Sequence, residues 1–336
     1  MRTLTIISAL TLLLAFAQQA ATAQSKTGTT VGQFLLIEPS ARAAGMGNAG
    51  VTTGGEPLSA YFNPGSLGRL EQSGVQITHS AWLADITFNY GIAAMKIGAN
   101  TVMLSITTLN SGDIAVRTED QPLGTGELYS VSDLSVGLGF GRRITDRFSA
   151  GIQAKFVRET IWNSSMNAAA LDLGVVYQLP FGVYIGASLS NFGGRASYDG
   201  RDLRIRFDQD PDEFGGNSNL PAALETDAFN LPIFFRVGVG YPVELGPSSR
   251  LLLVADAFHP SDNTESVSFG AEWTFMNVFS ARAGYQNLFL QDSYVGLTLG
   301  AGINANLSGF GFRFDYAWND YDLLGNTQRF TMGVAF

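Results

Sequence analysis

The chain has 336 residues and a formal net charge of −9, since 20 lysine and arginine residues stand against 29 aspartate and glutamate residues. This acidic balance argues against nucleic-acid binding, because neutralising phosphates requires a basic face. The absence of cysteine from the sequence excludes disulfides and thiolate chemistry, and the presence of only two histidines argues against histidine-based metal or acid–base clusters. Only 15% of residues are charged and 46% are hydrophobic, a balance typical of an outer-membrane barrel.

Residues 1–23 have the features of an export signal. A short positive start precedes a mostly apolar stretch over residues 4–16, and Ala21-Thr22-Ala23 supplies a cleavage site of small residues. No cysteine lies near this site, which excludes a lipoprotein anchor. No later stretch reaches the roughly 18 apolar residues that a membrane helix requires.

Residues 24–71 are predicted to form a hatch or plug. Residues 31–37 could be a short strand or the start of a helix, and residues 40–50 could hold one small-residue helix. A short helical turn is expected over residues 58–62. Turns are expected at Gly54-Gly55 and at Asn63-Pro64-Gly65. This close-packing segment stands in front of an unbroken series of strands, so a barrel wound around it is expected over residues 72–336.

Fourteen strands are predicted, each about the 9–11 residues, or slightly more, that a tilted strand needs to cross a bilayer. They are expected at residues 72–82, 85–96, 99–110, 128–141, 147–159, 167–178, 181–192, 231–243, 249–259, 264–276, 278–287, 293–306, 309–319 and 327–336.

Hydrophobic and polar residues alternate along these segments. In the fifth, Phe148, Ile152 and Phe156 share one face, whereas Gln153 and Lys155 share the other. The same pattern sets Leu171, Leu173 and Val175 against Asp172, and Phe312, Phe314 and Tyr316 against Arg313 and Asp315. A charge facing lipid costs about 2–4 kcal/mol at the midplane, so the polar faces are expected to look inward. Lys155, Asp172, Arg313 and Asp315 are thus candidate polar residues of the lumen.

The connections favour a barrel over a soluble β-sandwich, which would show the same alternation. Short turns are expected near residues 97–98, 142–146, 179–180, 244–248, 277 and 307–308. Most of the others, including 111–127, 160–166, 193–230, 260–263, 288–292 and 320–326, are longer. Short periplasmic turns opposite longer extracellular loops are the asymmetry of outer-membrane barrels. A tight turn near Ala84 departs from it.

Aromatic residues mark the strand ends and the C-terminus. Trp82, Trp162, Trp273, Trp318 and Tyr321 are predicted to form girdles at the membrane interfaces. The last segment places Phe330, Met332, Val334 and Phe336 on one face. It resembles the terminal strand by which outer-membrane proteins are handed to the barrel assembly machinery, so Phe330 and Phe336 are the candidate assembly signal.

Three patterns that could carry chemistry have simpler explanations. Gly45, Gly47 and Gly50 match G-x-G-x-x-G, but no βαβ pattern surrounds them, so close backbone packing is the better account. Asp208, Asp210, Asp212 and Glu213 could hold calcium, yet they do not follow EF-hand spacing, and a solvated acidic loop is favoured. No G-x-S-x-G motif accompanies His79 or His259, so no enzymatic activity, catalytic residue, cofactor or metal is predicted.

The N-terminal third resembles the PorV/PorQ family of outer-membrane proteins, which is related to FadL-type transporters. The matching stretches are SARAAGMG at 40–47, AYFNPGSL at 60–67 and HSAWLADI at 79–86. Arg42, Gly45, Gly47, Asn63 and Pro64 fall in the hatch motif of this resemblance. The family usually reads Asn-Pro-Ala where this chain has Asn63-Pro64-Gly65. The match is strong over residues 31–98 and only architectural beyond them.

The resemblance implies a fourteen-stranded barrel in the bacterial outer membrane, in contact with its lipid. For PorV itself, it also implies a role in type IX secretion, with the translocon and the C-terminal domains of secreted cargo as partners. A FadL-like transporter of hydrophobic small molecules is the alternative, and a purely structural barrel is the third possibility.

Overall fold

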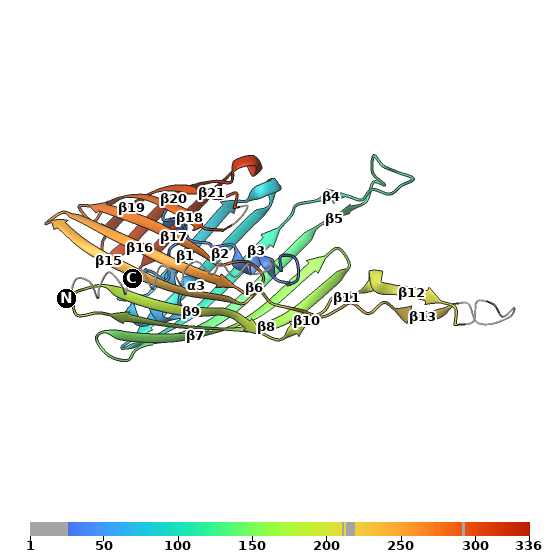
Figure 1. The fold of residues 1–336 in the computed structure, drawn as a ribbon, viewed down its shortest axis with the longest axis horizontal. Helices are drawn as coiled ribbons and strands as arrows, with labels where there is room; N and C mark the ends of the chain where they lie inside the picture. Colours follow the sequence, from blue (N-terminus) through green and yellow to red (C-terminus); the bar gives the residue numbers. More distant parts are fainter. Residues whose placement is uncertain (1–25, 210–211, 213–218, 291–292) are drawn as a thin grey trace, which may run out of the picture.

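A computed structural model of the protein describes residues 26–209, 212, 219–290 and 293–336. The predicted export signal at residues 1–23 lies outside these ranges. Fourteen antiparallel strands form a closed barrel, in which neighbours along the chain are neighbours in the sheet (Figure 1). β1 and β21 close the ring by pairing from Gly74–Ala335 to Ala81–Gln328.

All fourteen predicted strands are present, with ends shifted by a few residues. The barrel strands are β1 (Gly74–Ala81), β2 (Thr87–Ile97), β3 (Asn100–Asn110), β6 (Val131–Arg143), β7 (Phe148–Ile161), β8 (Ser164–Gln178), β9 (Tyr184–Gly193), β15 (Phe234–Gly246), β16 (Ser249–Pro260), β17 (Ser266–Phe275), β18 (Phe279–Leu288), β19 (Leu297–Leu307), β20 (Phe310–Asp320) and β21 (Asn326–Ala335). Their alternating residues divide as predicted, since Ile152 and Phe156 are exposed on the outer face while Gln153 is buried inside.

The two ends of the barrel differ. Short turns lie at one end, which we call the short-turn end, together with the C-terminus; the opposite end is the long-loop end. One predicted long loop is wrong: β7 and β8 run further than expected, so residues 160–166 contain only a two-residue turn at Trp162-Asn163. Trp162 has a left-handed φ of 51° that permits this tight turn.

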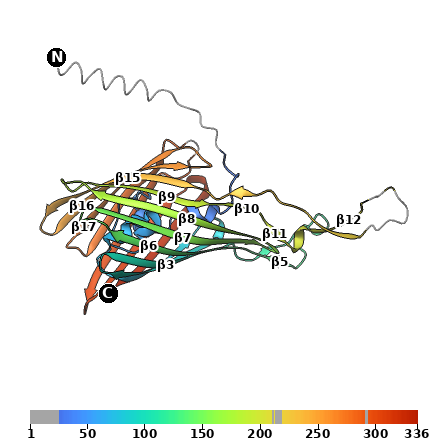
Figure 2. The same cartoon turned by 90° about the horizontal axis from the view of Figure 1, so that it is seen from below.

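Two extensions project from the long-loop end (Figure 1). The first is a hairpin with β4 (Ile114–Ala115) and β5 (Leu128–Tyr129). The second contains β10 (Arg195–Ala196), β11 (Asp199–Gly200), β12 (Arg204–Phe207), β13 (Leu220–Ala223) and β14 (Phe229–Asn230). Figure 2 shows this second extension and the C-terminus at opposite ends of the molecule. Short 3-10 turns lie at η3 (Leu83–Asp85), η4 (Arg201–Leu203) and η5 (Asp322–Leu324).

Residues 30–71, which we call the inner segment, lie against the inward faces of the strands. The segment contains η1 (Gln33–Leu36), α2 (Ala41–Ala44), α3 (Ser59–Phe62) and η2 (Pro64–Arg69). The helix α2 packs on β19, β20 and β21, while η2 packs on β6, β7 and β8. Among the described residues, no helix is long and apolar enough to span a membrane.

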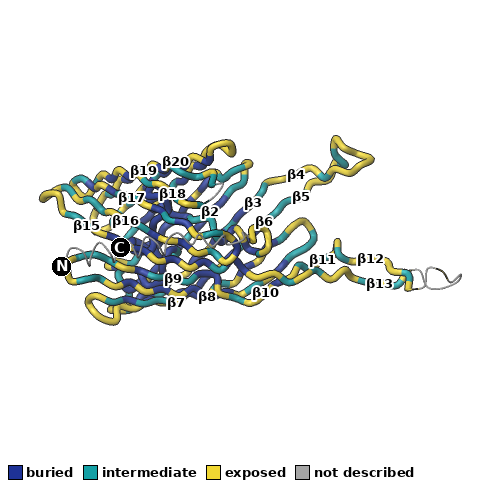
Figure 3. The backbone as a smooth tube through the Cα atoms, viewed as in Figure 1, coloured by how far each residue is buried: buried dark blue, intermediate teal, exposed yellow. Residues whose placement is uncertain are grey.

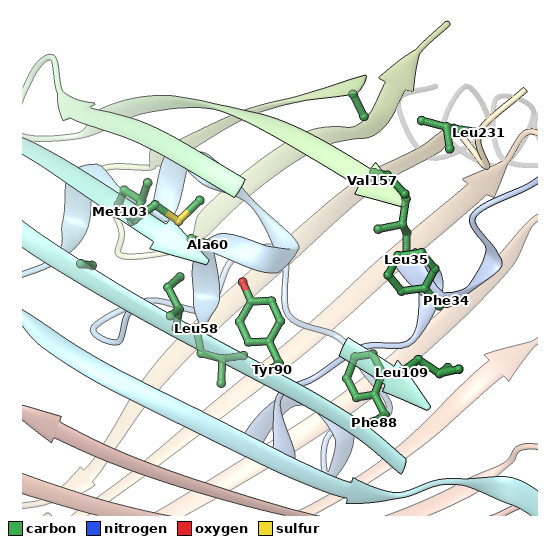
Figure 4. Close-up of a cluster of buried hydrophobic side chains, with 14 of the residues drawn as sticks. Phe34, Leu35, Leu58, Ala60, Phe88, Tyr90, Met103, Leu109, Val157 and Leu231 are labelled. Carbon is green, nitrogen blue, oxygen red and sulfur yellow. The ribbon is translucent and has the colours of Figure 1, made fainter. Parts of the chain in front are cut away.

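Buried residues concentrate within the barrel, and exposed residues dominate the extensions (Figure 3). An apolar cluster joins the inner segment to strands β2, β3 and β7 (Figure 4). Phe34, Leu35 and Leu58 come from the segment, and Phe88, Met103 and Val157 are among the strand residues that meet them. The barrel therefore encloses a packed core where a pore would otherwise run.

Candidate functional site

The centre of the barrel holds an ion network that ties the inner segment to the wall. Arg42 donates to both carboxylate oxygens of Glu272 on β17, at 2.8 Å from Nε and 2.6 Å from Nη2. A third donor of Arg42, Nη1, lies 3.0 Å from Oε1 of Glu56. Because all three side chains are buried, these charges persist only through their mutual contacts.

Two strand arginines complete the network. Arg282 on β18 contacts Glu272 at 2.6 Å and Asp315 at 2.8 Å. Arg313 on β20 contacts Asp315 at 2.6 Å and Glu56 at 3.3 Å. Three guanidinium groups thus face three carboxylates, and the network carries no net charge.

The turn after α3 forms a second attachment, on the other side of the lumen. Asn63 is fully buried and donates to the carbonyl oxygens of Val51 at 3.1 Å and Val175 at 2.9 Å. Its Oδ1 accepts from the Gly65 amide at 2.9 Å, which caps η2. Pro64 follows at the first position of η2, where its missing amide hydrogen costs nothing.

The glycines of the G-x-G-x-x-G pattern lie in close backbone contacts. A methyl group on Gly45 would lie 2.9 Å from the Cα of Gly300 on β19. Gly47 has a left-handed φ of 66°, and a methyl group there would lie 2.7 Å from the Tyr285 carbonyl oxygen. These contacts agree with the packing interpretation of the pattern.

The four predicted lumen residues fall into two separate groups. Arg313 and Asp315 belong to the central network. Lys155 instead contacts Asp172 at 2.8 Å and Asn191 at 2.5 Å, beside the irregularity in the β8–β9 pairing. Asp172 also accepts from the Asn191 amide at 2.7 Å, where the backbone has a left-handed φ of 62°.

Sequence reasoning missed half of the central network. Glu56, Glu272 and Arg282 were not singled out, although Glu272 and Arg282 occupy inward positions of alternating strands. A charge at such a position is the signal that could have identified them.

A further charged group lies deeper toward the long-loop end. Arg236 and Arg329 are buried on β15 and β21. Burial raises the pKa of Glu38 in the inner segment, although both arginines favour its ionised form. Arg329 also lies over the Trp82 ring, 5.2 Å from its centroid.

The remaining candidates from the sequence lie apart from this interior. His79 is hydrogen-bonded to Asn89 and His259 to Glu265, both in exposed positions. Asp210 and Glu213 of the acidic loop lie outside the described residues, and no group suited to metal binding occurs within them.

The aromatic residues do not all face the membrane. Trp162 and Trp273 are exposed, whereas Tyr321 is buried and packs edge-on against Trp82 with 5.5 Å between ring centroids. Tyr321 therefore belongs to the interior rather than to a girdle. Phe336 is 58% exposed at the short-turn end, and Phe330 packs beside Tyr316.

Comparisons with known proteins agree with this architecture. The profile of the family described as type IX secretion system protein PorV matches residues 19–228. Among curated proteins, none matches the sequence.

Similar solved structures include two toluene transporters and one FadL homologue. TbuX from Ralstonia pickettii is 13% identical with a TM-score of 0.54, covering 87% of this chain and 96% of its own. TodX from Pseudomonas putida is 11% identical with a TM-score of 0.55, covering the same 87% and 96%. The Pseudomonas aeruginosa FadL homologue is 11% identical with a TM-score of 0.54, covering 89% and 98%. At these identities the likeness concerns the fold alone.

Proposed function

The chain belongs to the family of the type IX secretion system protein PorV, and from this membership we propose that it is a carrier for secreted cargo. It is an outer-membrane β-barrel of that secretion system. In the proposal it binds the C-terminal signal domain of a secreted protein at its extracellular end and passes it from the translocon to the surface-attachment machinery.

The filled lumen is the observation that supports a carrier over a conduit. The inner segment is attached to β17 through Arg42 and to β8 through Asn63, on opposite sides of the barrel. Between these attachments the lumen contains the apolar cluster and the ion network. A folded protein has no path through such an interior, so cargo must be engaged outside it.

The second extension offers a surface for this engagement. All four residues of β12 are exposed, and alternation places Ile205 and Phe207 on one face and Arg204 and Arg206 on the other. Phe207 is 50% exposed at a position beyond the membrane-spanning strands. Apolar side chains exposed to water in this way mark protein contacts when they are grouped.

The test is affinity purification of the tagged protein from native outer membranes in mild detergent, followed by mass spectrometry. Wild-type protein is expected to recover a translocon barrel and secreted proteins that share one C-terminal domain. The variant Ile205→Ser with Phe207→Ser should recover less cargo. Phe181→Ser is the matched control, since Phe181 is 69% exposed but lies in a turn at the short-turn end. Equal cargo recovery by all three proteins would contradict the role of β12.

A transporter for hydrophobic small molecules is the second candidate. The apolar cluster facing the lumen favours it, since Phe88, Ile92 and Met103 occupy inward positions that are polar elsewhere in the barrel. A lone barrel that retains fatty acid after purification, without translocon or cargo, would support this function and contradict the carrier.

The roles of individual residues belong to the same proposal. Residues 24–71 are proposed to act as a hatch, held in place by Arg42, Gly45, Gly47, Asn63 and Pro64. Lys155, Asp172, Arg313 and Asp315 are proposed to give the lumen its polar contacts. Phe330 and Phe336 are proposed to be read by the barrel assembly machinery.

A further inference from the structure

A cavity of about 460 Å³ opens at the short-turn end, between the inner segment and the wall. The Gly54-Gly55 turn of the inner segment forms one side. The turn between β6 and β7, the start of β9 and the start of β16 form the others. Because short turns face the periplasm in outer-membrane barrels, the cavity opens to the periplasm.

The lining of this cavity is strongly cationic, in a protein whose net charge is −9. Two carboxylates line it, those of Glu71 and Asp146, against five arginines: Arg42, Arg69, Arg143, Arg147 and Arg250. Arg42 is neutralised by Glu56 and Glu272. The other four arginines form no ion pair with any described residue.

Two of these unpaired guanidinium groups are held in place by neutral groups. Arg69 lies over the Tyr184 ring, 4.0 Å from its centroid, and donates to the Thr52 carbonyl oxygen at 2.8 Å. Arg143 donates from Nε to the Gly68 carbonyl oxygen at 3.1 Å. Burial lowers the pKa of Arg69, and the neighbouring Arg42 and Arg143 lower it further, whereas Tyr184 raises it. Carbonyl oxygens and an aromatic ring fix the geometry of these cations without cancelling their charge.

Buried hydroxyl groups add to this imbalance. Thr52 and Ser149 both line the cavity, and only 4% and 2% of their respective surfaces are exposed. Neither hydroxyl oxygen has a hydrogen-bond partner among the described residues. Arginines on an open rim would be solvated and free to move, and they would not need fixed guanidinium positions or buried hydroxyl groups beside them.

We propose that this cavity binds a phosphate-type oxyanion on the periplasmic side of the barrel. A guanidinium group donates two parallel hydrogen bonds to such an anion, and a phosphate monoester offers three acceptor oxygens to several donors at once. A carboxylate offers two oxygens and could satisfy fewer of the four cations. The phosphate monoester could belong to a soluble metabolite or to the headgroup of phosphatidic acid in the inner leaflet, since both have three free oxygens.

The test uses the full chain in a non-ionic detergent and a phosphate-free buffer. Glycerol 3-phosphate is titrated into the protein by calorimetry, with acetate as the comparison anion. In parallel, dioleoylphosphatidic acid, whose headgroup is a phosphate monoester, is added and its retention is measured by native mass spectrometry. The two arms distinguish a soluble phosphate from a headgroup.

The variants are Arg250→Gln alone and Arg147→Gln with Arg250→Gln. Both residues are exposed and unpaired within the described part of the chain, so the barrel should still fold. Arg142→Gln is the control: Arg142 lies at the same end of β6 beside Arg143, but on the outer face and outside the cavity. The double variant is expected to weaken binding about tenfold or more, as befits the loss of two charge-assisted contacts. The control should stay close to wild type.

Either arm supports the site if its signal is lost in the double variant and kept in the control. The proposal is overturned if wild-type protein binds neither probe, if acetate binds as tightly as glycerol 3-phosphate, or if Arg142→Gln weakens binding as much as the double variant. The last result would indicate general attraction of anions to a basic rim. Failure of the carrier function would leave this measurement unchanged, since it requires neither translocon nor cargo.

Discussion

At the scale of single residues, the interior is governed by how buried charges are compensated. The pKa of Glu56 is a balance: burial opposes ionisation, but Arg313 and Arg42 outweigh it and hold the pKa below the ordinary value of 4.5. For Glu38 burial prevails over Arg236 and Arg329, and the pKa is raised. The contributions of these two carboxylates to folding stability therefore change with pH in opposite directions.

These directions predict the pH dependence of stability. Glu56 stabilises the folded state above pH 4.5, and this contribution is lost as the pH falls through its lowered pKa. Glu38 destabilises the folded state increasingly as the pH rises from 4.5 through its raised pKa. Glu56→Gln should flatten the acid side of the stability profile, and Glu38→Gln should flatten the opposite side. Thermal unfolding in detergent, followed by circular dichroism from acid to neutral pH, measures both. Parallel profiles for the two variants would contradict the assignment.

A second residue-scale prediction concerns the hydrogen bonds of Asn63. Asn63→Ala removes two donors from buried carbonyl oxygens and the cap of η2, so a loss of about 2–3 kcal/mol is expected. Ser66→Ala is the control in the same turn, because the buried Ser66 hydroxyl has no hydrogen-bond partner among the described residues. That change should be close to neutral. Chemical denaturation of the purified barrels measures both, and equal losses would show that Asn63 acts only by filling space.

At the scale of elements, the inner segment depends on how closely its backbone approaches the wall. The four-residue helix α2 gains little from its own hydrogen bonds, since so short a helix is unstable alone. Its position comes from close contact with β19 and from the ion pairs of Arg42. Glycine is required where the two backbones meet, because a side chain would separate them.

Alanine substitutions at Gly47 and Gly55 distinguish two costs of adding a side chain, namely backbone strain and steric clash. Both have left-handed φ angles, of 66° and 81°, but a methyl group on Gly55 would meet nothing within 4 Å. Gly55→Ala should therefore cost only about 1 kcal/mol of backbone strain. Gly47→Ala adds the clash with Tyr285 and should cost about 1–3 kcal/mol more. Unfolding in denaturant measures the difference, and limited proteolysis should cut the inner segment faster in Gly47→Ala. Indistinguishable variants would show that the close approach is not needed.

At the scale of the whole molecule, the barrel was predictable and the interior contacts were not. Alternation along a strand is a local pattern, so strands such as β7 and β20 could be located from a dozen consecutive residues. Arg42 and Glu272 are 230 residues apart, and their contact depends on both the barrel register and the path of the inner segment. Nothing local distinguishes Tyr321, which is buried, from an interfacial aromatic such as Trp273. The turn at Trp162 was not predicted because hydrophobic alternation weakens at the end of β7, where Arg158 and Thr160 follow Phe156 on the outer face.

The C-terminal strand closes the barrel, and the side chain of Phe336 at its end is expected to affect assembly rather than stability. β21 pairs with β1, and the Phe336 amide donates to the Ser73 carbonyl oxygen at 2.9 Å, but the Phe336 side chain is 58% exposed. Removing an exposed side chain should change the free energy of unfolding by no more than about 0.5 kcal/mol. If the side chain is recognised during assembly, Phe336→Ala should nevertheless reduce the amount of folded protein in the outer membrane several-fold.

Phe310→Ala is the matched control, because Phe310 is 48% exposed on the adjacent strand β20. Heat-modified electrophoretic mobility of membrane fractions measures the folded amount, and unfolding of the purified variants measures stability. An equal decrease for both variants would indicate a general need for apolar outer surface, and a large loss of stability in Phe336→Ala would place its effect in the folded barrel instead.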